Sequence, residues 1–463
     1  MSKVRILIGV ILLLVVATMP IPYASNREFA WAPFAVIVGA IFLTHVYCLV
    51  TDVHDHYPVS ASLVLAAAAM SVVLVWTALQ SMPWFSSGIS SVFIVLVPEA
   101  LGRSLPNPVS VDAEATAQGF VKLAVYCAVF ALAADLGRSA RYARAATFTV
   151  IGATLVVAAY GFVMQATTHS CVALLVVKSP IEASGSCAFS GTFINSGNFA
   201  TYAGMSCLVC IAHLHWLVLK SNNAQSGTRE RWRIHLMVMG REGSAYLAAL
   251  IILVSALVLS ASRAGLLSFI LAAVLMITAT SVAQGKNAGH VATWTGITIG
   301  LALSVLVAAD GVVLLRYLDL FDRGDSNRIA LFELAIKQIE ARPWTGWGLG
   351  SFPTLYSIFQ PPTVPLVFDK THNIYLENAS DLGIPAALLL TLAVIALAIR
   401  CLRGLRERSR DLPYPAIAVG ATILIGLQSL VDFGIQMPAV AVTFSTLLGV
   451  GWAQSWSSRR SSG

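Results

Sequence analysis

Residues 244–283 read SAYLAALIILVSALVLSASRAGLLSFILAAVLMITATSVA and contain one charged side chain, Arg263. A helix that crosses a bilayer needs about 20 mostly apolar residues, so this stretch is long enough for two spans. We predict helices over 244–261 and 264–283, which only Ser262 and Arg263 separate, so that they form a tight hairpin. This stretch therefore predicts an all-α membrane protein.

The composition of the chain agrees with that fold class. Of the 463 residues 57% are hydrophobic and 11% are charged, against about 25% charged in soluble domains. These values exclude a soluble globular enzyme, a disordered chain and a disulfide-stapled secreted module. The net charge of +7 indicates no nucleic-acid partner, because cytoplasmic loops of membrane proteins collect Lys and Arg.

Ten further apolar stretches bring the predicted spans to twelve in a single membrane domain, 1–463. The first begins with Lys3 and Arg5, as a signal peptide does, but it lacks a small-residue cleavage site and a second span follows at once, so we expect a retained helix. The ten stretches are 4–20, 31–50, 59–79, 118–135, 146–165, 198–219, 291–309, 382–400, 414–430 and 439–456.

Basic residues set the expected orientation. With both termini in the cytoplasm, the strongly basic loops 136–145 and 401–412 also fall on the cytoplasmic side, as the positive-inside rule requires. Three long segments then face outward: 80–117, 166–197 and 310–381. The last, between the ninth and tenth spans, is predicted to form a helical cap.

An amphipathic helix is predicted inside 310–381. Ile329, Phe332, Ile336 and Ile339 recur at helical spacing, Asp325-Ser326-Asn327 offers an N-cap, and Pro343 ends the pattern. Arg328 falls in the first turn, where a cation opposes the helix dipole. It is either a surface arginine paired with Asp322 or Asp325, or an anion ligand.

Two further motifs follow in the same segment. The stretch 343–352, PWTGWGLGSF, predicts a structured turn with aromatic walls, and no Lys-Ser/Thr follows to make it a phosphate loop. His372 then stands near the start of a helix, where a neutral imidazole can accept a proton from a hydroxyl or serve a structural role. Glu377 would orient that histidine or pair with Lys370.

Arg263 lies on the outer side, against the charge trend of the chain. It either snorkels to the interface or binds an anion, since its small neighbours leave room for a ligand. Arginine holds phosphate with a bidentate fork and stays charged. A lipid-linked diphosphate would fit this position.

The seven cysteines give no cofactor signal. Cys171 and Cys187 share the second outer loop, where a disulfide is plausible in an oxidising compartment. Cys207-x-x-Cys210 has redox spacing but lies in an apolar span, which favours packing. No cluster has metal-ligand spacing, so we expect neither metal nor cofactor.

Taken together, these pieces resemble the O-antigen ligase and polymerase family of bacterial membrane glycosyltransferases. Each motif is weak alone, but their order and spacing among the spans match the family over roughly 80–455. One departure is Ala264, where many members have a second glycine. The matching pieces are GTFINSGNFA at 191–200, SRAG at 262–265, Asn327-Arg328, PWTGWGLG at 343–350, HNIYLE at 372–377 and Leu382-Gly383.

The resemblance implies a GT-C-like enzyme at the periplasmic face of the bacterial inner membrane. It would move a glycan from undecaprenyl diphosphate to a hydroxyl of a glycan or lipid A–core acceptor, without a metal and with inversion. His372 would be the general base, and Arg263 and Arg328 would bind the diphosphate. Further substrate-binding candidates are Asn195, Asn198, Asn373, Glu377, Trp347 and Tyr375. Asn195, Asn198, Lys178, Arg316, Arg323 and Asp432 either line the cavity or serve as loop and helix-cap residues. The rings of Trp344, Trp347 and Tyr375 either stack on sugars or belong to a membrane-interface belt.

Three functions remain open on the sequence. A polymerase of exopolysaccharide or O-antigen repeat units is slightly favoured over an O-antigen ligase, because the segment 80–117, with its four prolines and Trp84, is more typical of exopolysaccharide members. A secondary transporter also fits twelve spans. Transporters, however, keep ionisable residues near the midplane, and here such residues gather at the outer edge.

Overall fold

The computed structural model describes residues 3–51, 60–83, 108–167, 172–173, 176–177, 189–222, 239–308, 323–360, 368–408 and 412–456. Eight of the described helices are long and apolar enough to cross a membrane, which confirms a polytopic helical membrane protein. They are α2 (Glu28–Thr51), α3 (Ala61–Ser81), α5 (Ala113–Leu136), α6 (Ala140–Thr167), α7 (Ser196–Asn222), α10 (Arg263–Ala283), α11 (Ala288–Ala308) and α16 (Ile384–Glu407).

Four shorter helices coincide with the remaining predicted spans. Each has 16 residues, or about 24 Å at 1.5 Å per residue, against a hydrocarbon core of about 30 Å. Every predicted span is thus helical, while the count of twelve membrane crossings stays a prediction. The four are α1 (Lys3–Thr18), α9 (Ser244–Leu259), α17 (Pro413–Gln428) and α18 (Pro438–Ala453).

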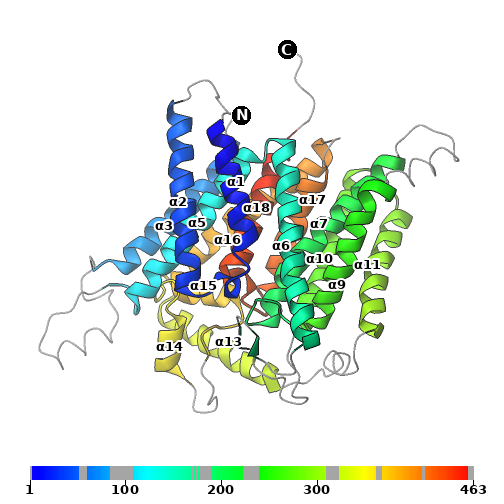
Figure 1. Cartoon of the computed structure of the whole chain (residues 1–463). Helices are drawn as coiled ribbons and strands as arrows, with labels where there is room; N and C mark the ends of the chain where they lie inside the picture. Colours follow the sequence, from blue (N-terminus) through cyan, green and yellow to red (C-terminus); the bar gives the residue numbers. More distant parts are fainter. Residues whose placement is uncertain are drawn as a thin grey trace, which may run out of the picture.

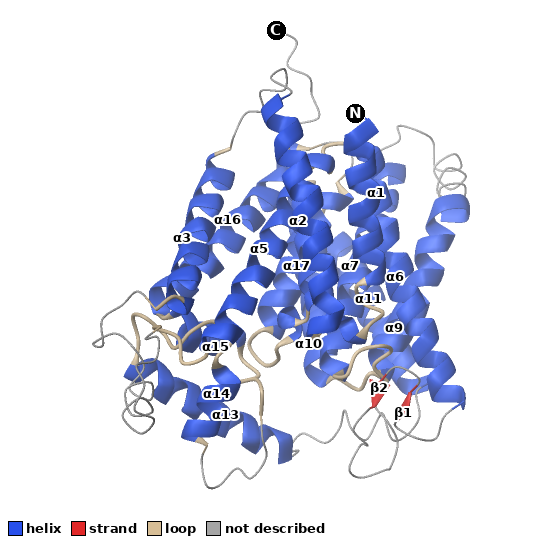
Figure 2. Cartoon of the chain, turned by 60° about the vertical axis from the view of Figure 1, so that its left-hand side comes forward, coloured by secondary structure: helices blue, strands red, loops and turns tan. Residues whose placement is uncertain are grey.

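The helices form a bundle around α7, α17 and α18. Every residue of α18 is buried, whereas α2, α3 and α11 show most of their surface at the periphery. Figure 1 places the start of α1 and the end of α18 at one end of the bundle, here called the terminal end. Three helices of the outer segment lie across the opposite end, here called the cap end, as Figure 2 also shows.

The loops that the charge pattern assigns to the cytoplasm meet at the terminal end. The Gln454 side chain donates from Nε2 to the Gly137 carbonyl at 2.6 Å, and Gln284 Nε2 donates to the Leu405 carbonyl at 2.8 Å. Arg5 pairs with Asp135 at 2.6 Å and fixes α1 to α5. The basic loops and the termini therefore share one end, which agrees with the predicted arrangement of loops.

Outside the cap, the remaining described elements are short connections between helices. They are η1 (Tyr23–Ser25), a π-helical turn η2 (Met239–Gly243), η3 (Gly434–Gln436), and the antiparallel two-residue strands β1 (Val172–Ala173) and β2 (Val176–Val177). Cys171 and Cys187 lie outside the described residues, as do Asp322, Lys178 and Arg316. The disulfide between the two cysteines stays a prediction.

The cap consists of α13 (Arg323–Ala341), α14 (Phe352–Phe359) and α15 (Ile374–Leu382). The predicted helix is present and ends before Pro343, but a different face packs. Leu331 and Leu334 are buried with Phe352 and Tyr356, whereas Ile329 and Ile336 are 60% and 45% exposed. The buried face is the one that contacts α15. On that face, the buried Gln338 side chain accepts a hydrogen bond from Ser380 of α15 at 3.0 Å.

The glycine turn, residues 344–350, locks the cap onto the bundle. Its Trp347 and Gly348 amides donate to the Ser380 and Asp381 carbonyls at 3.0 and 2.8 Å. Gln80 of α3 donates to the Thr345 and Asp381 carbonyls at 2.8 and 2.9 Å. Gly346 has φ +65°, and a Cβ there would lie 2.3 Å from the Asp381 oxygen, so only glycine fits this approach.

Candidate active site

His372 occupies a strained position just before α15. Its φ is +57°, in the left-handed region that a histidine adopts uncommonly. The imidazole packs edge-on against Phe433, with ring centroids 4.9 Å apart, and its side chain is 18% exposed. Such strain is stored where the surrounding structure fixes the residue, and it often marks a functional site.

Asp432 faces the imidazole from the segment after α17. Its Oδ1 lies 3.5 Å from His372 Nδ1, a buried atom with no hydrogen-bond partner in the described part of the chain. Because Nδ1 is covered, the exposed surface of the side chain belongs to the rest of the ring. A small closing movement would give the carboxylate–imidazole pair that orients a general base.

The start of α7 supports the Asp432 carboxylate. Asn195 Oδ1 caps this helix by accepting from the Gly197 and Asn198 amides at 2.7 and 3.2 Å. A Cβ on Gly197 would lie 2.1 Å from Asp432 Oδ2, so the carboxylate rests against the helix N-terminus. The helix dipole stabilises negative charge there.

Two more donors hold Asp432 in place. The Phe433 amide donates to Oδ1 at 2.9 Å, and the Gln428 side chain donates to Oδ2 at 3.3 Å. The nearby Asn198 side chain is buried, and its Oδ1 has no partner among the described residues. The structure therefore brings Asn195 and Asn198 to the same place as Asp432 and His372.

Glu377 organises the segment that carries His372 and pairs with Lys370, the second of its two predicted roles. Its buried carboxylate accepts from the Thr371 amide at 3.0 Å, from the Thr371 hydroxyl at 2.9 Å and from Gln436 Nε2 at 2.7 Å. Lys370 Nζ lies 3.4 Å from it. These bonds fix the backbone on both sides of the strained histidine.

Asn373 and Tyr375 fix the same segment to α17. Asn373 caps α15 through Oδ1, and its Nδ2 donates to the Leu430 carbonyl at 3.1 Å. The Tyr375 hydroxyl donates to the Gly426 carbonyl at 3.0 Å. Both residues therefore have structural hydrogen bonds in addition to their predicted role in binding substrate.

The two arginines belong to different elements. Arg263 is the first residue of α10, after Ser262, whose hydroxyl accepts from the Gly265 amide at 3.1 Å. A Cβ on Gly265 would lie 2.5 Å from Ala200 Cβ, so α10 begins against the first turns of α7. Arg328 lies half-buried on α13, one turn before Leu331 of the cap core.

The aromatic candidates differ in exposure. Trp347 is buried, donates to the Gln338 carbonyl at 2.9 Å, and has Arg342 over its ring at 4.3 Å. Trp344 is 75% exposed, and Tyr375 is 37% exposed. Trp347 thus stabilises the glycine turn, whereas the other two rings remain available at the surface.

Sequence reasoning gave Asp432 no special weight, although it faces the histidine. Sixty positions separate the two residues, and no local pattern links them. The available signal in the sequence is an acidic residue just after the predicted span 414–430. It lies in the short loop that the predicted topology places on the outer side. Glu377, closer in sequence, was the more obvious partner.

Asp381 is a second buried carboxyl beside the glycine turn. Its Oδ2 accepts from the Gly350 amide at 2.7 Å, and its Oδ1 has no partner in the described part of the chain. Burial, followed by the charge of Glu377 one turn away, raises the pKa of Asp381 well above its ordinary value. The folded protein therefore favours the neutral acid at this position.

We expect this carboxyl to make stability depend on pH. A raised pKa in the folded state stabilises the fold fully below the unfolded pKa, near 4, and the contribution is lost as pH rises toward the folded pKa, by up to about 1.4 kcal/mol per pH unit. Thermal unfolding of the protein in nanodiscs between pH 4 and 9 measures it. Asp381→Asn mimics the neutral acid and should flatten the slope; an unchanged slope would contradict the assignment.

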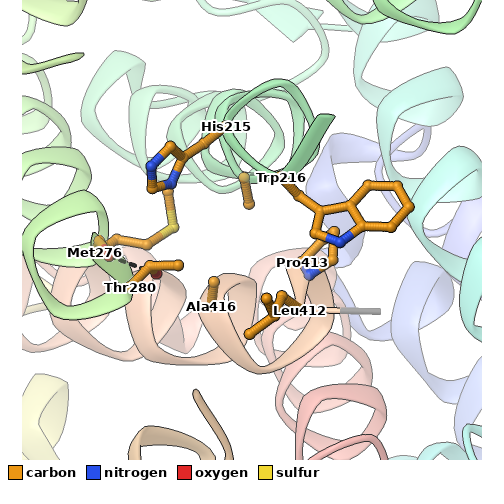
Figure 3. Close-up of a pocket in the computed structure, with 8 residues that line it drawn as sticks. His215, Trp216, Met276, Thr280, Leu412, Pro413 and Ala416 are labelled. Carbon is orange, nitrogen blue, oxygen red and sulfur yellow. Dashed lines mark hydrogen bonds between the residues drawn. The ribbon is translucent and has the colours of Figure 1, made fainter. Parts of the chain in front are cut away.

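A separate shallow hollow lies between α7, α10 and α17 near the terminal end. Figure 3 shows its lining, which includes His215, Met276 and Leu412. His215 is 17 residues beyond Asn198 on α7, or about 25 Å along the helix. The hollow therefore does not belong to the site around His372. Among the described residues, no group of three or more His, Cys, Asp or Glu could hold a metal ion.

The central part of the chain is similar to a known protein family. Residues 248–391 match the model of the O-antigen ligase family. The match runs from α9 into α16 and contains Arg263, Arg328, the glycine turn and His372, while Asn195 and Asp432 lie outside it. No curated protein matches the chain. Residues 248–391, about a third of the chain, are thus similar to the O-antigen ligase family.

Proposed function

We propose that the protein transfers a glycan from undecaprenyl diphosphate to a hydroxyl group of an acceptor sugar at the periplasmic face of the inner membrane. The observation that carries the proposal is the His372–Asp432 pair, 3.5 Å apart at the cap end of a chain similar to this family. The basic loops at the opposite end support a cytoplasmic location for the termini.

The reaction is a single displacement at the anomeric carbon. The acceptor oxygen attacks that carbon from the face opposite the diphosphate, the bond between carbon and diphosphate oxygen breaks, and undecaprenyl diphosphate leaves with the electron pair. The hydroxyl proton moves to Nε2 of His372, the nitrogen away from Asp432, and Asp432 balances the positive charge on the imidazolium. The configuration at the anomeric carbon inverts.

Arg263 and Arg328 act on the leaving group. Charge develops on the diphosphate as the bond breaks, and arginine forks stabilise this charge more in the transition state than in the ground state. Arg263 lies beside α7, whose N-terminus also favours an anion. No step in this scheme needs a metal ion.

The preferred form of the activity is polymerisation of lipid-linked repeat units. The proline-rich segment 80–117 favours it, although most of that segment lies outside the described residues. Transfer to lipid A–core is the alternative, and the name of the matched family favours it. A product that still carries undecaprenyl diphosphate identifies a polymerase, and a product on lipid A–core identifies a ligase.

The experiment measures glycan transfer from a purified lipid-linked donor by the protein in nanodiscs. Arg263→Gln and Arg328→Gln should each weaken binding of undecaprenyl diphosphate by about tenfold and reduce transfer further, because each removes charge-assisted hydrogen bonds. Arg141→Gln, in the first turn of α6 at the terminal end, is the matched control. Diphosphate binding that is the same in all four proteins would remove the arginines from the site.

A further inference from the structure

The cap helix α13 has three different faces. Leu331 and Leu334 lie on the face that packs against α14, and Gln338 bonds to α15 from the same face. Successive residues of a helix are about 100° apart around its axis, which puts the exposed residues Glu333 and Lys337 on one flank of the packed face. The opposite flank is apolar. It carries Ile329, Phe332, Ile336 and Ile339, here called the isoleucine stripe.

The isoleucine stripe is open in the described structure. Ile329 and Ile336 are 60% and 45% exposed, and Phe332 and Ile339 are half-buried. Such exposure is unfavourable if both flanks of α13 meet water, because apolar surface is driven out of water. A helix with one face on protein, one charged flank and one apolar flank suits the boundary between water and lipid.

The orientation of α13 suits the same boundary. In Figure 2, α13 lies over the cap end and runs across the direction of the spanning helices. An amphipathic helix bound to a membrane surface lies in the plane of that surface, with its apolar face where headgroups meet acyl chains. In this orientation the isoleucine stripe, which extends over about three turns, can reach a similar depth along its length.

The chain after α13 returns to the lipid-facing surface of the bundle. The amide of Ile384, the first residue of the candidate span α16, donates to the Pro343 carbonyl at 2.8 Å. Ile384 is 40% exposed, and Leu388, one turn further along, is 56% exposed. Exposed apolar side chains on a spanning helix face lipid. Trp344, which follows Pro343, is 75% exposed, and tryptophan is enriched where a spanning helix leaves the membrane.

We propose that the isoleucine stripe and the Trp344 ring insert into the membrane leaflet at the cap end, and that the partner of this surface is the phospholipid of that leaflet. The hydrogen bond between Ile384 and Pro343 makes the surface continuous with the lipid-facing side of α16. The charged flank of α13 stays in water. Trp344 is then an interface residue and does not stack on a sugar. The inference needs no assumption about glycan transfer.

Insertion of α13 fixes the depth of Arg328. This residue precedes Phe332 by one helical turn and lies between the packed face and the isoleucine stripe. With the stripe at the boundary of the acyl chains, the arginine lies at the level of the lipid headgroups. The diphosphate of a lipid-linked donor lies at the same level. Under the proposed function, the membrane would thus help to align Arg328 with its ligand.

The test measures the depth of single nitroxide labels on the full chain in phospholipid nanodiscs. The native cysteines are replaced by alanine, and Ile329→Cys, Ile336→Cys and Trp344→Cys are labelled one at a time. Power saturation compares collisions with oxygen, which concentrates in lipid, and with a nickel chelate, which stays in water. Leu388→Cys on α16 is the lipid reference, and Lys337→Cys on the charged flank of α13 is the water reference.

Insertion predicts that the ratio of oxygen to nickel collisions at the three labelled positions is several-fold higher than at Lys337 and close to that at Leu388. A ratio equal to that at Lys337, at either isoleucine or at Trp344, would overturn the proposal. Exclusion of both reagents, together with dipolar broadening between labels, would show a second copy of the chain on this surface and would overturn it as well.

A second measurement uses the wild-type protein and so remains valid if the cysteine variants fold poorly. The protein is reconstituted with a phospholipid that carries a photoreactive diazirine near the start of an acyl chain, then illuminated and digested. Mass spectrometry should find lipid adducts on the isoleucine stripe and on Trp344 as well as at the start of α16. Adducts confined to the spanning helices would contradict insertion of the cap. Neither experiment measures glycan transfer, so this result would leave the proposed function standing.

Discussion

Replacing His372 with Asn should lower the rate of glycan transfer by about 10²- to 10⁴-fold, the range that general-base catalysis contributes. Asparagine suits the test because it tolerates the left-handed backbone at φ +57°, whereas alanine would add strain to the loss of the imidazole. Single-turnover transfer from a lipid-linked donor measures the effect. Binding of undecaprenyl diphosphate should stay unchanged, because the base does not hold the leaving group.

Two further variants decide what the histidine does. His290→Gln changes a histidine whose Nε2 lies 3.0 Å from that of His215, on α7 near the terminal end, and should leave transfer unaffected. Asp432→Asn removes the charge opposite His372 and should reduce kcat while shifting the acidic limb of the pH–rate profile. Full activity of His372→Asn would exclude it as the base, and an Asp432→Asn protein with a lower rate but the wild-type pH profile would contradict a positioning role.

Gly346→Ala should destabilise the protein by about 3 kcal/mol and abolish transfer in most of the sample at 37 °C. The left-handed φ of +65° disfavours a side chain, and the new Cβ would lie 2.3 Å from the Asp381 oxygen and 2.4 Å from the Gly383 nitrogen. Both contacts are with backbone, which cannot rotate away. Thermal unfolding in nanodiscs measures the loss.

Alanine variants of two other glycines distinguish the backbone strain at Gly346 from the steric clash there. Gly350 has φ +83°, but its nearest neighbour to an added Cβ is 3.4 Å away, so Gly350→Ala should cost only the backbone strain of about 1 kcal/mol. Gly296 lies within α11 with nothing within 4 Å, and Gly296→Ala should be neutral or stabilising. A Gly346→Ala protein as stable as Gly296→Ala would show that the glycine turn does not lock the cap.

Much of the fold follows from the sequence because apolar length is a local property. Each predicted span coincides with a helix, and the hairpin at Arg263 occurs where Ser262 can cap α10. The packed face of α13 could not be predicted in the same way. Its isoleucine stripe gives the stronger pattern, but pairing of Gln338 with α15 decides which face is buried.

The residues of the candidate site also differ in whether local sequence or packing reveals them. His372, Glu377 and Arg263 are prominent because each lies in a short motif. Asp432 can be recognised only from packing, because its neighbour His372 lies sixty positions earlier in the chain. The glycine turn was recognised as structured, yet its buried partner Asp381 has no sequence signal beyond its place after Glu377.

The bonds between α15 and the end of α17 have a consequence for how specificity can change. His372 and Asp432 are aligned by the Ile374–Ser429 and Asn373–Leu430 hydrogen bonds, and none of these four residues comes from α13, α14 or the glycine turn. The alignment of His372 with Asp432 therefore depends on α15 and on the end of α17, and the exposed surfaces of α13 and α14 away from Arg328 and the isoleucine stripe are free to vary. Under the proposed function, changes in these surfaces would alter which sugars bind while His372 keeps its alignment.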